Sequence, residues 1–309
     1  MQSINELVSL QQFDHFELLA QQIVEGFITG MHRSPYHGFS VEFAEHRAYN
    51  TGESVKHIDW KLYGKTEKLY VKRYEEETNM RTQLVIDTSS SMLFPYINNS
   101  LQNKRSFAAL SAAALIHLLI KQRDAVGLSL FNEKLELHTP SKLSRVHIQL
   151  LYKELNILLR TEKDAKALNK GNNLPLVLHQ IADTIHKRSL VVIFTDMIDN
   201  SNPDTLFAAL QHLKYNKHEV ILFHVVDHAK ELQLNFENRP TKFIDLETGE
   251  VLTLNPNEIK ETYKVRSQQF VKELTYKCMQ HQIDLVEADI NKGFEQVLLS
   301  FLVKRNKLY

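Results

Sequence analysis

Beyond residue 80, short apolar runs alternate with longer amphipathic stretches. Uninterrupted apolar runs of this length are typical of parallel strands that are buried on both faces. They predict strands over residues 84–87, 125–131, 190–194, 220–226 and 283–286. The stretches between them predict helices over residues 104–123, 144–160, 174–187, 203–215, 256–281 and 294–303. Such repeated strand–helix units indicate an α/β protein with a doubly wound, mostly parallel sheet.

Two hairpins are expected within this pattern. Residues 135–138 follow the strand at 125–131 closely enough to pair with it. Residues 243–252 have the pattern of a hairpin that turns at Thr248-Gly249. We therefore expect a main domain over residues 81–309 with a hairpin insertion near residues 240–253.

The first 80 residues follow a different pattern. Apolar positions in residues 4–29 have nearly helical spacing. Residues 33–77 are short segments punctuated by glycine, with a strand expected over residues 69–74. Residues 1–80 are thus expected to form an N-terminal extension of helix and short strands.

Composition narrows the classes of function. Lys plus Arg and Asp plus Glu both number 37 in 309 residues, so the formal net charge is zero. Nucleic-acid binding normally shows a strong basic excess, so no nucleic-acid partner is expected. The single cysteine, Cys278, excludes an internal disulfide and a multi-cysteine zinc site, and it fits a reducing compartment.

The sequence predicts neither a signal peptide nor a membrane-spanning segment. Residues 1–22 lack the basic start and apolar core of a signal peptide. The longest apolar stretch, residues 110–120, contains Ser111 and His117 and is too short to span a bilayer. These features predict a cytoplasmic protein without direct membrane insertion.

The strongest chemical signal follows the apolar run that ends at Asp87. The sequence there is Asp87-Thr88-Ser89-Ser90-Ser91, with an acid and two hydroxyls at alternate positions. In open α/β sheets, ligands bind just beyond the carboxyl ends of the strands. Carboxylate and hydroxyl oxygens at such a place are hard ligands that suit Mg²⁺.

This stretch resembles the metal-ion-dependent adhesion site of von Willebrand factor A-type domains, which have a Rossmann-like fold. The resemblance implies a second carboxylate from another strand end, and Asp196 follows the strand expected at 190–194. It also implies a third loop with a threonine after a glycine, and Asn173 of Gly171-Asn172-Asn173 stands at that threonine position. An amide oxygen can also ligate Mg²⁺ or Ca²⁺. The expected metal ligands are Asp87, Ser89, Ser91, Asn173 and Asp196.

The segment before the site makes the resemblance more specific. The motifs are, in order, Ser34-Pro35-Tyr36-His37-Gly38-Phe39-Ser40-Val41-Glu42-Phe43, Arg47-Ala48-Tyr49, Gly52-Glu53, Ile58-Asp59-Trp60 and Leu69-Tyr70-Val71-Lys72. Leading into Asp87, this succession resembles the bacterial domain-of-unknown-function 58 family. His57 stands where that family often has an arginine.

The resemblance implies a partner and a cofactor. Members of the family are encoded beside MoxR-type AAA+ ATPases, often in gene clusters for stress or aerotolerance. The implied role is a non-enzymatic adaptor or chaperone-like partner of the ATPase, with other von Willebrand factor A-like proteins as further partners. The implied cofactor is Mg²⁺, or Mn²⁺ or Ca²⁺ in its place.

A second group of residues in the resembling segment has two interpretations. Arg47, Tyr49, Asp59 and Trp60 are either a structural cluster around a buried indole or a docking surface for the partner. Trp, Tyr and Arg are enriched in interaction hot spots, and a single Trp is usually part of a core.

Two other functions stay open beside non-enzymatic binding. A metal-dependent hydrolase would use the same acids, with His179 or His224 as general base. A structural scaffold without metal would fit Asn173 in the third loop. A phosphatase with Asp87 as nucleophile is disfavoured, because Ser89 stands where the general acid would be needed. No glycine-rich phosphate loop and no serine-nucleophile elbow occur in the sequence.

Overall fold

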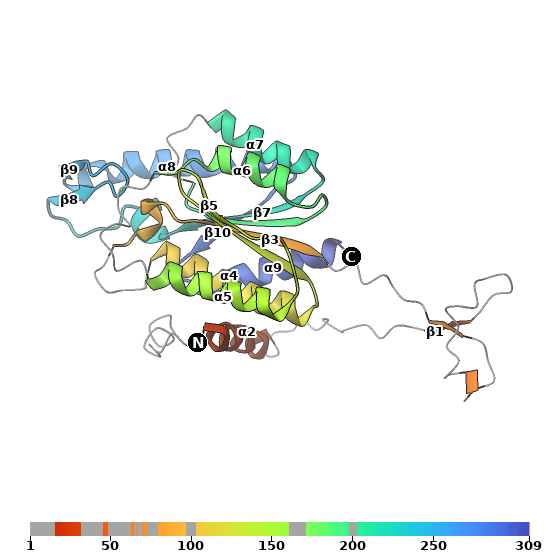
Figure 1. Cartoon of the computed structure of the whole chain (residues 1–309). Helices are drawn as coiled ribbons and strands as arrows, with labels where there is room; N and C mark the ends of the chain where they lie inside the picture. Colours follow the sequence, from red (N-terminus) through yellow and green to blue (C-terminus); the bar gives the residue numbers. More distant parts are fainter. Residues whose placement is uncertain are drawn as a thin grey trace. The chain divides into compact units, whose positions relative to one another are not determined.

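A computed structural model of the chain describes residues 16–31, 46–48, 63–64, 66, 70–72, 80–96, 103–160, 171–197 and 203–308 (Figure 1). The chain divides into two compact units. One unit comprises Met1–Thr29 and Met80–Tyr309, and the other comprises Gly30–Asn79. The expected division into residues 1–80 and 81–309 stays a prediction.

Within the described residues, the larger unit is built on a six-stranded sheet. In spatial order its strands are β10 (Asp284–Asp289), β7 (Glu219–Val226), β6 (Leu190–Thr195), β3 (Arg81–Asp87), β4 (Ala125–Phe131) and β5 (Leu135–His138). Neighbouring strands pair in parallel except β5, which is antiparallel to β4. The predicted strands and the first hairpin are confirmed, and the fold is α/β with a mostly parallel sheet.

Helices cover both faces of this sheet (Figure 1). On one face lie α6 (Leu174–Thr184), α7 (Pro203–Tyr215) and α8 (Pro256–Gln280). On the other lie α4 (Lys104–Lys121), α5 (Arg145–Arg160) and α9 (Glu295–Leu308). Val85, Val191 and Ile193 of the sheet share one buried core with apolar side chains of α6, α7 and α8. This burial on both faces explains why the strands lack polar alternation.

A further helix, α2 (Phe16–Met31), contains part of the helical segment expected over residues 4–29. Its Phe16 ring meets the Tyr152 ring of α5 edge to face, with 6.5 Å between the ring centres. Residues 4–15 of that prediction lie outside the described part of the chain. Of the described helices, none is both long enough and apolar enough to cross a membrane.

The second hairpin is formed by β8 (Thr241–Ile244) and β9 (Val251–Leu254), as expected. Asp245 N–H donates to the Glu250 carbonyl at 2.9 Å, which closes the turn. Gly249 has φ +75°, a conformation that favours glycine, so the predicted turn position is confirmed.

The smaller unit contains a short antiparallel pair, β1 (His46–Ala48) and β2 (Tyr70–Lys72). β2 confirms the core of the strand expected over residues 69–74. Arg47 lies in β1, whereas Tyr49, Asp59 and Trp60 lie outside the described residues. The two interpretations of this group of residues stay predictions.

The order of the strands identifies where a ligand site should form. β3 is followed in the chain by β4 on one side, and the chain then crosses to β6 on the other side of β3. The carboxyl ends of β3 and β6 therefore form the switch point of the sheet, where α/β proteins bind ligands. Asp87 ends β3, and Asp196 directly follows β6.

Candidate functional site

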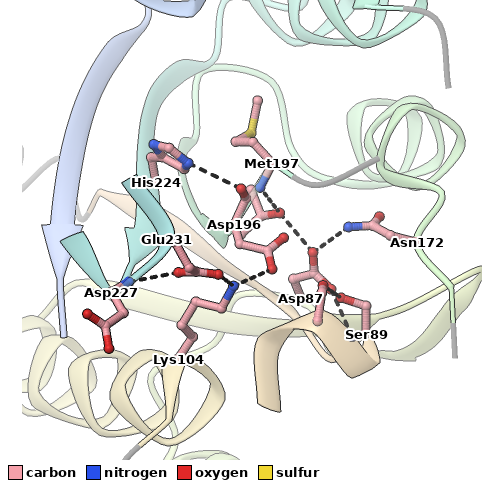
Figure 2. A network of polar contacts seen from close by, with 11 residues as sticks. Asp87, Ser89, Lys104, Asn172, Asp196, Met197, His224, Asp227 and Glu231 are labelled. Carbon is pink, nitrogen blue, oxygen red and sulfur yellow. Dashed lines mark hydrogen bonds and ion pairs between the residues drawn. The ribbon is translucent and has the colours of Figure 1, made fainter. Parts of the chain in front are cut away.

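Asp87 is the centre of a hydrogen-bond network at this switch point (Figure 2). Its side chain is fully buried. Asp87 Oδ1 accepts a hydrogen bond from Ser89 N–H at 2.9 Å. Asp87 Oδ2 accepts one from the Thr195 hydroxyl at 2.8 Å and one from the Asn172 side-chain amide at 2.5 Å. Two segments that are distant from Asp87 in sequence, at Asn172 and Thr195, thus converge on its carboxylate.

The surroundings of Asp87 favour a positive partner. Burial raises the pKa of Asp87 to about 7, and the charge of Asp196 acts in the same direction. Hydrogen bonds from Ser89 and Thr195 oppose this rise only in part. A cation beside the carboxylate would offset the cost of its charged form and lower this pKa.

Ser89 and Ser91 place a pair of hydroxyls next to this site, and the Ser89 side chain bonds to the Asp87 carboxylate. They lie at the start of η3 (Ser90–Leu93), a short 3-10 helix that follows β3. Their Oγ atoms are 3.0 Å apart and share a hydrogen bond, with Ser89 buried and Ser91 partly exposed. Adjacent oxygen ligands of an octahedral Mg²⁺ ion are separated by about 3.0 Å, since each lies about 2.1 Å from the metal. The hydroxyl pair has this spacing.

The third loop brings Asn172, rather than Asn173, to Asp87. Asn173 is the N-cap of α6, and its Oδ1 accepts the Leu176 N–H at 3.4 Å. Asn172 donates to Asp87, while its own Oδ1 is buried without a hydrogen-bond partner. Buried polar atoms rarely stay unpaired, and a cation would supply this oxygen with a partner. Asn173 is therefore engaged in capping the helix, one residue away from the contact with Asp87.

Asp196 is paired with a buried lysine that the sequence did not single out (Figure 2). Lys104 Nζ lies 2.7 Å from Asp196 Oδ2 and 2.5 Å from Glu231 Oε1. The lysine is the first residue of α4 and is fully buried. Because a positive charge in the first turn opposes the helix dipole, its position was a signal of a special role. Its two partners could not be read from the sequence.

Glu231 is held in place by the segment after β7. It belongs to η6 (His228–Leu232), a single wide turn, and its Oε2 accepts the Asp227 N–H at 2.8 Å. The Tyr263 hydroxyl of α8 donates to the Glu231 carbonyl at 2.7 Å. Burial lowers the pKa of Lys104, but the charges of Asp196 and Glu231 outweigh burial and raise it. Lys104 therefore carries a positive charge near neutral pH.

The two histidines considered as general bases have other contacts. His224 Nε2 lies 3.2 Å from the Asp196 carbonyl, and burial lowers its pKa to about 4. A base with so low a pKa is a weak proton acceptor near neutral pH. His179 of α6 pairs with His212 of α7, with 3.0 Å between their Nδ1 atoms.

A further carboxylate reaches the site from the turn of the β8–β9 hairpin. Burial raises the pKa of Glu247 to about 7, against the hydrogen bonds that Ser91 gives it, and Asp196 and Asp245 add to the rise. Its Oε1 is buried without a hydrogen-bond partner. Sequence reasoning missed Glu247, because its contact with Ser91 depends on how the hairpin is placed.

The oxygens available at the site fit a hard cation. In the described part of the chain, no group of three or more His, Cys, Asp or Glu side chains is arranged to hold a metal ion. The donors present include the Asp87 carboxylate, the Ser89 and Ser91 hydroxyls, the Asn172 amide oxygen and the Glu247 carboxylate that Ser91 contacts. Such oxygens, completed by water, suit Mg²⁺ better than a transition metal.

A family model matches residues 45–272, well over half of the chain, and is described as "Protein of unknown function DUF58". The chain belongs to this family. The match includes every residue of the site from Asp87 to Glu247. Relatives include uncharacterized proteins of Mycobacterium tuberculosis and Mycobacterium bovis, which are 25% identical over 214 residues. The aligned region is 68% of this chain and 63% of each relative, so the chain spans less than two-thirds of their length.

Solved structures with some similarity are also known. A conserved hypothetical protein, BatB from Bacteroides thetaiotaomicron, has 13% identity and a TM-score of 0.45, over 74% of this chain and 99% of that chain. An uncharacterized membrane-spanning protein from Vibrio fischeri has 14% identity and a TM-score of 0.20, over 73% and 97%. The topology of the sheet alone defines the α/β fold of the chain.

Proposed function

We propose that the chain is a non-enzymatic protein-binding module with a von Willebrand factor A-like domain and a divalent-metal site of the adhesion type. One observation carries the proposal. The Ser89 hydroxyl bonds to the buried carboxylate of Asp87 at the switch point of the sheet, and it lies 3.0 Å from the Ser91 hydroxyl.

The chemistry of these donors favours capture of a carboxylate. Hydroxyl oxygens are neutral, so a Mg²⁺ ion held by them keeps much of its charge and attracts a further anionic ligand. Ser91 is partly exposed and marks the accessible side of the site. An acidic side chain of a partner protein is the proposed ligand there, with Mn²⁺ or Ca²⁺ as substitutes for Mg²⁺.

The partner we propose is a MoxR-type AAA+ ATPase, with the chain as adaptor or chaperone-like component of a stress or aerotolerance system. Other von Willebrand factor A-like proteins are further proposed partners. This part rests on the family resemblance. Sedimentation of the purified chain with the MoxR-type ATPase of the same organism tests it, and failure to form a complex with Mg²⁺ would contradict it.

The metal site is tested by thermal unfolding with Mg²⁺, Mn²⁺ or EDTA, for the unaltered chain and Asp87→Ala. An ion that binds only the folded state stabilises it, by about 2.7 kcal/mol at a hundredfold excess over Kd. We expect a metal-dependent rise in Tm for the unaltered chain and none for Asp87→Ala.

Asp183→Ala is the matched control, because Asp183 is an exposed acid on α6. It should keep the metal-dependent rise. An equal rise in Asp87→Ala would show that the ion binds elsewhere.

A structural scaffold without metal is the second candidate, and one observation favours it. The Lys104 ammonium already neutralises Asp196, the second acid of the expected site. Absence of any metal-dependent rise in Tm would support the scaffold. Turnover of a phosphoester that is lost in Asp87→Asn would instead support a hydrolase.

A further inference from the structure

Lys104 stands where a cation would otherwise neutralise Asp196. We propose that Lys104 is the internal cation of this site, and that its ammonium competes with a divalent ion for Asp196. Lys104 thereby sets how strongly the site binds metal. The inference deepens the proposed function, because it concerns the regulation of the same site.

The buried charges around Lys104 are the first support for this competition. Its side chain is fully buried, and the exposed fractions of the Asp196 and Glu231 side chains are 1% and 18%. Buried charges are tolerated only when they are paired, so each of these acids needs a positive partner. Two acids, Asp196 and Glu231, contact the Lys104 ammonium, and the charge of Asp196 also acts on Asp87. A divalent ion beside Asp87 would therefore be attracted to Asp196 as well.

The position of the Lys104 ammonium is the second support for the competition. The Asn103 side chain accepts the Ser106 N–H at 2.8 Å and so defines the first turn of α4, which begins with Lys104. The centre of the Phe94 ring also lies 5.7 Å from Nζ. The position of the Lys104 ammonium is therefore restricted. The outcome of the competition depends on whether Asp196 pairs with this ammonium or with the divalent ion.

Glu231 is the third support for the competition, because it gives the Lys104 ammonium a second acidic partner. The Glu231 carboxylate bridges Lys104 Nζ and the Asp227 N–H. If Asp196 turns towards a metal ion, the ammonium stays paired with Glu231 and no buried charge is left alone. With two acidic partners for Lys104, Asp196 can leave the ammonium and bind a metal ion. In a simple ion pair, the same change would leave the buried ammonium without a partner.

A purely structural ion pair makes a different prediction. Removal of Lys104 would then lower stability and leave the affinity for metal unchanged or weaker. Competition predicts that the affinity for metal rises when the ammonium is removed, because Asp196 becomes available and the repulsion between two cations is lost.

The test is a direct titration with Mn²⁺, in which the signal of the free ion is followed by electron paramagnetic resonance. The proteins are the unaltered chain, Lys104→Met and Lys121→Met. Lys121 is the exposed last residue of the same helix, so its variant is the matched control. We expect Lys104→Met to bind Mn²⁺ about tenfold more tightly, which corresponds to about 1.4 kcal/mol, and Lys121→Met to be unchanged.

A second pair of variants keeps the test decisive if Lys104→Met does not fold. In Lys104→Met/Glu231→Gln, one positive and one negative charge are removed together, so the net charge of the site is preserved. It is compared with Glu231→Gln, in which Asp196 is the remaining acidic partner of Lys104 among the described residues. Tighter Mn²⁺ binding is expected in the double variant than in Glu231→Gln.

The outcomes separate this inference from the proposed function. Equal or weaker binding after removal of Lys104 overturns the inference and leaves the proposed function intact. Binding in Lys104→Met but none in the unaltered chain supports the inference and overturns a metal-dependent function for the native chain. No binding in any protein overturns both.

Discussion

Asp87 and Lys104 show how far single residues could be assigned in advance. Asp87 follows an apolar run, and this local pattern was enough to place it at a strand end. Lys104 lies in the first turn of a helix, but its partners Asp196 and Glu231 are 92 and 127 residues away in the sequence. Contacts over such separations are decided by the packing of the sheet and its helices.

Asp87 is expected to make stability depend on pH. Its pKa rises from 3.8 to about 7 on folding, so between these values the folded chain holds a proton that the unfolded chain has released. Stability therefore falls as the pH rises through that interval, by up to about 4 kcal/mol. Thermal unfolding in EDTA over this pH range should show the fall in the unaltered chain and a smaller one in Asp87→Asn.

The asparagine variant is a suitable comparison for structural reasons. Asn172 can reverse its side-chain amide and accept from the new Nδ2, so the hydrogen bond is preserved. Glu247 has a pKa of about 7 and contributes its own pH dependence in both proteins. Identical pH profiles for the two proteins would contradict the assignment to Asp87.

At the scale of elements, the positions of strands and helices followed from periodicity. The contacts made by side chains at the ends of these elements did not. The start of α6 at Leu174 was predicted, yet the pattern did not show that Asn173 caps the helix and Asn172 faces Asp87. The two asparagines are chemically identical, and only the path of the backbone distinguishes them.

Gly127 in β4 is expected to tolerate no side chain. An added Cβ would lie 2.4 Å from Gln83 Oε1 and 2.6 Å from the Thr139 carbonyl, and the latter is backbone that cannot turn aside. Gly127→Ala should lower the free energy of unfolding by about 1–3 kcal/mol, measured with a chemical denaturant.

Gly26→Ala in α2 is the matched control for this substitution. A Cβ at Gly26 would meet no atom within 4 Å, so alanine should stabilise the helix by about 0.5–1 kcal/mol. Equal effects of the two substitutions would refute the steric explanation.

At the scale of the whole molecule, the last helix joins parts of the larger unit that are far apart in sequence. Lys304 of α9 contacts Glu219 of β7 and Asp284 of β10, each at 2.8 Å. Arg305 contacts Asp124, just before β4, at 2.9 Å. Asp124 also accepts the Met80 N–H at 3.1 Å, so one buried acid links α9 to the residue before β3.

Arg305→Ala is expected to weaken this link between α9 and the sheet. Asp124 is nearly fully buried, and loss of Arg305 removes the cation that offsets its burial. The free energy of unfolding should fall by about 1–3 kcal/mol. Arg239→Ala removes an exposed ion pair with Glu237 and should change it by less than about 1 kcal/mol, which denaturant unfolding can distinguish.

The amino-acid sequence by itself determined the α/β class, the strand and helix positions of the larger unit, and the place of the Asp87 motif. These features follow from local periodicity, because burial on both faces requires continuous apolar strands and amphipathic helices. The chain continues from strand to helix in repeated units, so the mostly parallel arrangement also followed.

The tertiary structure alone decided which charges meet at the site. The pairing of Lys104 with Asp196 and Glu231, the contact of Asn172 with Asp87 and the approach of Glu247 to Ser91 all join separate segments. Electrostatic interactions depend on distance and burial, and neither can be read from spacing along the chain. The sequence therefore indicated a cation site, and the fold supplied the lysine that already competes for it in our proposal.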